Sequence, residues 1–150
     1  MIKIICVGKI KEKYNKDAVE EYLKRLSKYT NIEIVEVQDY DYDLEKTLIM
    51  EKNEILKHIK LNDYLISLDI NGEELNSEVF SKTVDTVIQK SKVITFIIGG
   101  SYGLHNEIKE KSNKIISFSK LTFPHQLFRV LFLEQIYRAF KIINNEKYHK

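Results

Sequence analysis

Apolar and polar residues alternate along the chain with two different periods. Short apolar runs that are rich in β-branched residues are typical of buried strands. Such runs occupy residues 2–7, 32–37, 64–68, 93–98 and 115–118, and residues 69–72 are expected to form the turn that closes the third run. Between them, apolar residues recur every three or four positions, which predicts amphipathic helices. These helices cover residues 12–29, 44–59, 77–88 and 125–143, with Asn76 or Ser77 as the expected N-cap of the third. A further helix is expected to begin near Leu104, after Gly99 and Gly100 end the fourth strand.

This alternation predicts the fold class. Strands separated by helices at this spacing form βαβ units, so we expect an α/β fold with a mostly parallel sheet of five or six strands and helices on both faces. The run Val93–Ile98 is apolar apart from Thr95, which suits a central strand. Ligands in such sheets bind at the carboxyl ends of the strands. Functional residues are therefore expected just after the third, fourth and fifth strands.

The composition fits a single domain over residues 1–150, with 43% hydrophobic residues to fill a core. The one cysteine, Cys6, cannot form an internal disulfide and lies in an apolar run. This indicates a buried structural thiol and favours a reducing compartment, the cytoplasm. No apolar run approaches the length of about 18 residues that a membrane span needs. The first strand begins at once, so we predict no signal peptide.

Charge is distributed unevenly along the chain. The formal net charge of +2 is too small by itself to indicate nucleic-acid binding. Lysines crowd residues 9–28 and 141–150, and acidic residues occupy positions 33–45 between them. A solvated lysine-rich face is the simpler explanation of the basic clusters on composition alone.

Three of the five glycines lie in the segment Gly99–Gly103, directly after the most apolar strand. Glycines let a backbone turn sharply and approach a ligand closely, although a tight turn without a ligand remains an alternative. The dinucleotide fingerprint requires G-x-G-x-x-G after the first strand and an acidic residue about 20 positions later. Here the order is G-G-x-x-G, and Ser119 and Lys120 stand at that distance. A nucleotide-binding oxidoreductase therefore fits poorly.

The last helix and the loop before it form a second candidate region. Pro124 biases Phe123 toward an extended conformation and is well placed to open the helix, which a plain loop and cap would also explain. The helix is apolar around nearly its whole circumference, so we expect a partner subunit to cover part of it. Glu134 and Arg138 are spaced for an ion pair along the helix. No set of His, Cys, Asp and Glu has metal-ligand spacing, so we predict no metal.

Taken together, these features resemble the RlmH family of the SPOUT (α/β-knot) methyltransferases. The resemblance covers essentially the whole chain. It is carried by the segments 4–9, 96–104, 119–125, 129–130, 134–139 and 148–150. It implies a C-terminal trefoil knot and a homodimer. It also implies that S-adenosyl-L-methionine is held bent in the knotted loops and leaves as S-adenosyl-L-homocysteine.

The resemblance also implies which positions contact the cofactor, mostly through the backbone. They are Leu68, Gly99, Gly100, Gly103, Phe118, Ser119, Lys120, Leu121, Thr122 and Phe123. The implied reaction is methylation of N3 of a pseudouridine in a stem-loop, helix 69, of the large-subunit rRNA within the ribosome. Because the acceptor nitrogen must lose a proton, a base within hydrogen-bond reach is expected, unless water takes that proton.

We assign the base to His149, and a positioning role to Tyr148 and Arg138, as an expectation from this resemblance. A short polar terminus is usually frayed, which is the competing interpretation of the C-terminal tail, Tyr148–Lys150. Lys150 stands where some relatives have arginine, and this lysine keeps the charge but lacks the planar fork of a guanidinium. A non-catalytic RNA-binding module is the other alternative, and it would have no need of a cofactor loop.

Overall fold

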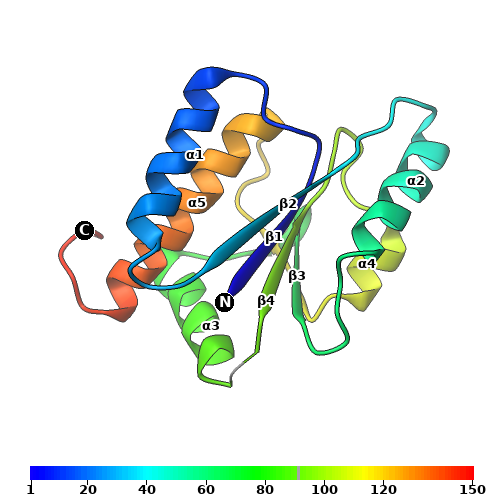
Figure 1. Cartoon of the computed structure of the whole chain (residues 1–150). Coiled ribbons are helices and arrows are strands. Elements are labelled where there is room, and N and C mark those ends of the chain that lie inside the picture. Colours follow the sequence, from blue (N-terminus) through cyan, green and yellow to red (C-terminus); the bar gives the residue numbers. More distant parts are fainter. Residues whose placement is uncertain (91) are drawn as a thin grey trace.

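Five parallel strands form the centre of the structure, and helices cover both faces of the sheet (Figure 1). The computed structural model describes residues 1–90 and 92–150. The strands are β1 (Ile2–Val7), β2 (Ile32–Val37), β3 (Tyr64–Glu74), β4 (Ile94–Ile98) and β5 (Lys114–Ser117). The helices are α1 (Lys13–Leu26), α2 (Leu44–Leu56), α3 (Ser77–Gln89), α4 (Asn106–Lys111) and α5 (His125–Ile143).

The strand order across the sheet is β2-β1-β4-β3-β5, and each neighbouring pair is parallel. Strand β4 lies in the middle, and every residue of β1 and β4 is buried. The expected α/β fold with a mostly parallel sheet is confirmed, with five strands in the described part of the chain. The trefoil knot stays a prediction.

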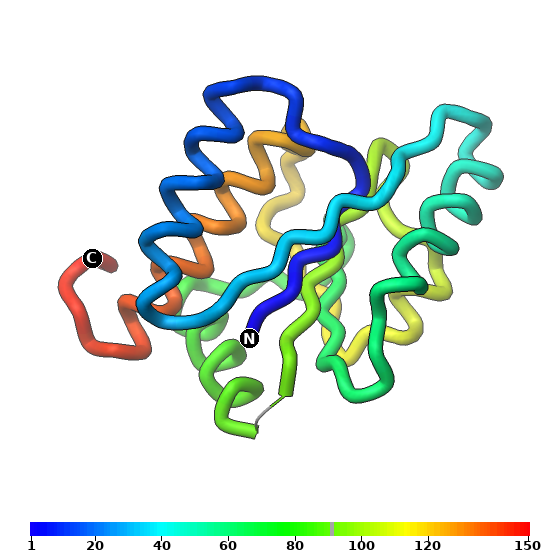
Figure 2. Tube along the Cα trace, viewed as in Figure 1, coloured from blue at the N-terminus to red at the C-terminus, as the bar shows by residue number. Residues whose placement is uncertain are grey.

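Two helical layers sandwich the sheet. Helix α5 packs between α1 and α3 on one face, and α2 and α4 cover the other (Figures 1 and 2). The larger core lies under α1, α3 and α5, where the rings of Phe96 and Phe132 meet edge to face with centroids 4.8 Å apart. A smaller core around Ile97, Ile55 and Ile108 joins α2 and α4 to the opposite face. Helices on both faces are therefore confirmed.

Strand β3 departs from the predicted pattern. The sequence predicts a strand that ends at Leu68, with residues 69–72 as a closing turn, but β3 continues to Glu74. Both Leu68 and Glu73 pair with Ile116 of β5, so the residues between them bulge out of the ladder. A side chain at Gly72 would place its Cβ 2.7 Å from the backbone of Ile116, so only glycine fits this close approach. Local turn signals could not reveal that pairing resumes after a bulge.

The capping signals at the helix starts predicted the structure more accurately than the turn signal in β3 did. The Asn76 side chain accepts a hydrogen bond from the Val79 backbone N–H at 2.8 Å, which caps α3 as expected. Pro124 directly precedes α5. Cys6 is fully buried, and this burial raises the pKa of its thiol to about 12, which confirms a structural thiol. No helix in the described residues has the length and apolar character to cross a membrane.

Candidate active site

A cleft of about 640 Å³ opens at the carboxyl ends of β3, β4 and β5. Three loops line it: the bulge of β3, the glycine turn after β4, and the loop between β5 and α5. Among the predicted cofactor residues, the lining includes Leu68, Gly99, Gly100, Gly103, Phe118, Ser119, Leu121, Thr122 and Phe123. Lys120 is exposed and does not line the cleft. Segments far apart in sequence therefore meet in one place, and we call it the cofactor cleft.

Two different constraints require glycine in the turn Gly99–Gly103, which we call the glycine turn. A Cβ at Gly99 would lie 2.6 Å from the carbonyl carbon of Gly103, so the turn itself excludes a side chain there. The Gly103 N–H donates to the Gly100 carbonyl at 3.0 Å, which closes the turn. Gly103 has a φ of +77°, which favours glycine, and nothing lies within 4 Å of its missing Cβ. A tight turn is thus required, and it leaves backbone uncovered in the cleft.

The loop from β5 to α5 is fixed by one aromatic side chain. The Phe118 ring contacts Phe80, Phe128 and Phe132, with centroids 5.4 to 6.1 Å away. The Ser119 hydroxyl accepts a hydrogen bond from the Leu121 N–H at 3.0 Å. These contacts hold the backbone in one shape beside an apolar wall. An apolar wall with a few backbone polar groups fits an adenosine-like ligand bound mainly through main-chain contacts.

The predicted catalytic residues form a separate network at the end of α5. The Arg138 guanidinium donates to Glu134 at 2.7 Å, which confirms the expected pair. The Tyr148 hydroxyl donates to the same Glu134 oxygen at 3.0 Å. Arg138 also lies 3.2 Å from Nδ1 of His149, whose Nε2 lies 3.0 Å from Glu78. The C-terminal tail is therefore docked on α3 and α5 and is not frayed.

This network assigns the protons on the tail. Arginine can only donate, so Nδ1 of His149 accepts from Arg138 and Nε2–H donates to Glu78. Both ring nitrogens are thus occupied, and His149 must leave Arg138 before it can accept a proton. Burial, and then the hydrogen bond to Glu134, raise the pKa of Tyr148 to about 12. Tyr148 therefore remains a neutral donor at physiological pH.

The tail network faces a second cavity, of about 460 Å³, between α3 and α5. This cavity and the cofactor cleft have five lining residues in common: Ile116, Ser117, Phe118, Phe123 and Phe128. The two hollows therefore adjoin along these residues, and His149 lines only the second one. The structure thus brings Arg138, Tyr148 and His149 together, but it does not bring them into the cofactor cleft of their own chain.

Residues 1–149 match the family model described as "Predicted SPOUT methyltransferase". The chain belongs to the SPOUT methyltransferase family. A relative from Caldicellulosiruptor saccharolyticus, "Ribosomal RNA large subunit methyltransferase H", is 54% identical, and the match covers 100% of both chains. A protein of the same name from Streptococcus uberis is 52% identical, and that match covers 99% of each chain.

Two solved structures support the fold of this SPOUT family member. A probable methylase family protein from Haemophilus influenzae has a TM-score of 0.58 at 16% identity, covering 99% of this chain and 70% of that one. A probable methyltransferase from Bordetella pertussis has a TM-score of 0.57 at 11% identity, covering 92% of this chain and 93% of that one. At these identities the likeness concerns the fold alone.

The sequence interpretation missed one feature of the cleft. Asp69 and Asn71 in the β3 bulge line it, and so does Lys109, whose ammonium lies 3.0 Å from the Asp69 carboxylate. The signal that could have identified Asp69 is its position directly after the third apolar run, where ligands of parallel sheets bind. The turn-like composition of Asn71–Gly72 conceals this position in the sequence.

Proposed function

We propose that this SPOUT family member transfers a methyl group from S-adenosyl-L-methionine to large-subunit rRNA and releases S-adenosyl-L-homocysteine. One observation supports this above the others. The cofactor cleft gathers Leu68, the glycine turn and the 118–123 loop at the carboxyl edge of the sheet. Relatives at 52–54% identity, named as rRNA methyltransferases, support RNA as the substrate.

In this proposal the chain's own residues mainly bind and orient. The turn Gly99–Gly103 and the loop after β5 present backbone groups, and Phe118 keeps that loop in place. The cofactor supplies an activated sulfonium methyl group, so alignment with the acceptor and exclusion of water provide most of the acceleration. Loop shape then matters more than side-chain chemistry in the cleft, which agrees with the exposed position of Lys120.

We further propose N3 of a pseudouridine in helix 69, within the assembled ribosome, as the acceptor. This assignment comes from the family resemblance. His149 takes the imide proton in this scheme, after exchanging its contact with Arg138 for the acceptor. Tyr148 and Arg138 orient His149 or an RNA phosphate. A ribosomal substrate implies action in the cytoplasm.

Two measurements test this function. Calorimetry should detect binding of S-adenosyl-L-methionine to the purified protein and should detect no binding of NAD. Binding of NAD would instead indicate an oxidoreductase. Mass spectrometry of rRNA from a deletion strain should show loss of one methyl group on a pseudouridine, restored by the wild-type gene. Cofactor binding without any change in rRNA would retain the methyltransferase and reject the substrate. RNA binding without cofactor binding would indicate a non-catalytic module.

We also propose a homodimer that buries the apolar face of α3 and α5. Val79 of α3 and Leu127 and Leu131 of α5 are 38–42% exposed on two helices that pack together, and Leu131 lines the cavity that also holds Glu134 and His149. Soluble monomers rarely leave such a patch uncovered. In the dimer, the tail of one chain would lie beside the interface, within reach of the partner's cofactor cleft.

Leu131→Asp is expected to separate the dimer, because it places a charge in the centre of the proposed interface. Sedimentation should give wild-type protein a mass near twice the 17.8 kDa of one chain, and the variant a mass near one chain. Leu61→Asp is the matched control, since Leu61 is fully exposed before β3 and should leave the dimer intact. A wild-type monomer that methylates RNA would contradict the proposal.

A further inference from the structure

A third cavity, of about 900 Å³, lies at the carboxyl ends of β1, β2 and β4. Gly100, Ser101 and His125 line both this cavity and the cofactor cleft, so the two hollows adjoin along the glycine turn. One side of the third cavity is formed by the segment Gly8–Glu12, which we call the lysine loop. Carboxylates such as Asp39 line the cavity as well. Neither the fold nor the cofactor accounts for this hollow.

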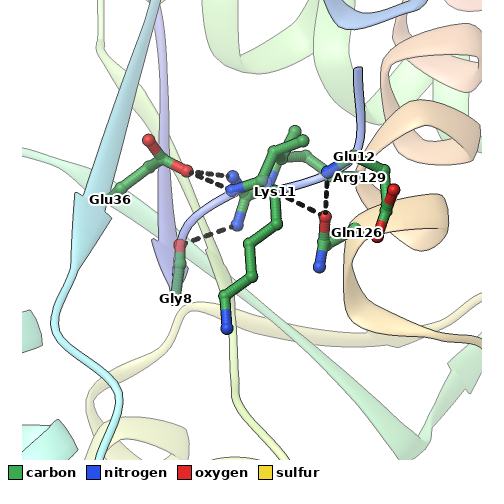
Figure 3. Close-up of polar contacts among 7 residues, drawn as sticks. Gly8, Lys11, Glu12, Glu36, Gln126 and Arg129 are labelled. Atoms are coloured by element: carbon green, nitrogen blue, oxygen red, sulfur yellow. Dashed lines mark hydrogen bonds and ion pairs between the residues drawn. The ribbon is translucent and has the colours of Figure 1, made fainter. Parts of the chain in front are cut away.

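The lysine loop is fixed in place by its own backbone. The Gly8 N–H donates to the Val37 carbonyl at 2.8 Å, and the Ile10 N–H donates to the Glu36 carboxylate at 3.0 Å. One oxygen of Gln126 accepts from the N–H groups of Lys11 and Glu12, at 2.7 and 3.3 Å (Figure 3). An exposed loop would ordinarily be mobile, but four of the five backbone amides of the lysine loop donate hydrogen bonds to other parts of the fold.

Arg129 of α5 completes the anchor. Its side chain is 3% exposed, and it donates to Glu36 at 2.6 Å and to the Gly8 carbonyl at 3.1 Å (Figure 3). Glu36 therefore joins the loop to α5, because the same oxygen accepts from Ile10 and from Arg129. A buried arginine is costly unless it is paired in this way. The anchor ties the lysine loop to the helix that follows the cofactor loop.

The two lysine side chains of the loop are left free while its backbone is held and Ile10 packs against the core. Lys9 and Lys11 are exposed, and neither ammonium has a carboxylate within 4 Å in the described part of the chain. Figure 3 shows the Lys11 side chain extending away from the anchor with no drawn contact at its ammonium. Lys13, just beyond the loop, differs because it pairs with Asp17 at 2.7 Å. Two unpaired cations thus stand on a rigid support at the third cavity.

We propose that Lys9 and Lys11 contact backbone phosphates of the RNA and hold the acceptor segment over the third cavity, next to the methyl donor. This inference rests on the proposed function. Lysine–phosphate contacts fix the register of a nucleic acid without reading its sequence. The carboxylates of Asp39 and Asp41 repel phosphate, so the backbone must run along the lysine loop and turn its bases toward the cavity. A rigid support matters because methyl transfer requires accurate alignment.

The test is the double variant Lys9→Gln/Lys11→Gln, assayed on ribosomes from a deletion strain over a range of KCl concentrations. We expect kcat/KM to fall roughly tenfold for each lysine lost. The dependence of log kcat/KM on log salt should become shallower by roughly 1.4 to 1.8, the value for two phosphate contacts. Calorimetry should give unchanged affinity for S-adenosyl-L-methionine, since neither lysine lines the cofactor cleft.

Lys60→Gln is the matched control, because Lys60 is equally exposed but lies before β3, at the amino end of the strand. If the double variant and this control have the same kcat/KM and salt dependence as the active wild type, the inference is overturned while the proposed function stands. If wild-type protein methylates no rRNA, the proposed function fails and this inference fails with it. Gln126→Ala, which removes the acceptor for Lys11 and Glu12, should also lower kcat/KM and spare cofactor affinity.

Discussion

Gly99→Val is expected to reduce binding of S-adenosyl-L-methionine below detection while the sheet still folds. A Cβ at this position would meet the Gly103 backbone at 2.6 Å, and backbone cannot move aside as a flexible side chain can. The turn must therefore open, and it forms one wall of the cofactor cleft. The core lies elsewhere, so circular dichroism and thermal unfolding should still report a cooperative fold. Calorimetry with the pure protein measures the loss.

Two alanine variants separate turn shape from general strain. Gly103→Ala forces a side chain into a φ of +77° in the cleft, and Gly8→Ala does the same at +88° outside it. Each should cost about 1–3 kcal/mol of stability. Only Gly103→Ala should weaken cofactor binding. The affinity should fall roughly 5- to 150-fold, which corresponds to the same 1–3 kcal/mol if that strain also opposes the cofactor-bound turn. Two results would contradict the assignment of the glycine turn to the cofactor site. One is equal cofactor affinity of the two alanine variants, and the other is wild-type cofactor affinity of a folded Gly99→Val protein.

The sequence predicted most of the elements because each strand and helix is encoded locally. Buried strands such as Val93–Ile98 have continuous apolar runs, and the amphipathic spacing identified α1, α2, α3 and α5, with ends shifted by a few residues. The β3 bulge was mistaken for a turn because Asn71–Gly72 has the composition of one. The strand order could not be obtained from any local pattern, because pairing depends on contacts between distant segments.

The candidate site was predictable to different degrees. The glycine turn and the loop after Phe118 carry strong signals, and both line the cofactor cleft. The place of the tail could not be predicted, because His149 contacts Glu78, 71 positions away. The role of Arg129 was equally hidden, since its partners Glu36 and Gly8 lie 93 and 121 positions away. Spacing rules describe neighbours along a helix or strand, and these contacts join separate elements.

Removal of Tyr148–Lys150 is expected to slow methyl transfer severely and to leave cofactor affinity unchanged. The tail faces the cavity between α3 and α5, and none of its three residues lines the cofactor cleft of its own chain. Binding of S-adenosyl-L-methionine should therefore not depend on it. Single-turnover methylation of ribosomes from a deletion strain, with calorimetry in parallel, distinguishes the two effects. Wild-type rates from the truncated protein would mean that the docked tail has only a structural role.

His149→Ala alone is expected to lower the single-turnover rate roughly 10²- to 10⁴-fold, the usual contribution of a general base. If His149 takes the imide proton, the rate of the variant should recover partly as pH rises, because hydroxide then replaces the imidazole. Tyr148 does not confuse this test, since its pKa of about 12 keeps it protonated over the assay range. Glu78→Gln is the control, because Glu78 contacts Nε2 of His149 and not Nδ1, the nitrogen that would take the proton. A slow variant without recovery at high pH would assign His149 to positioning and leave the base to another group.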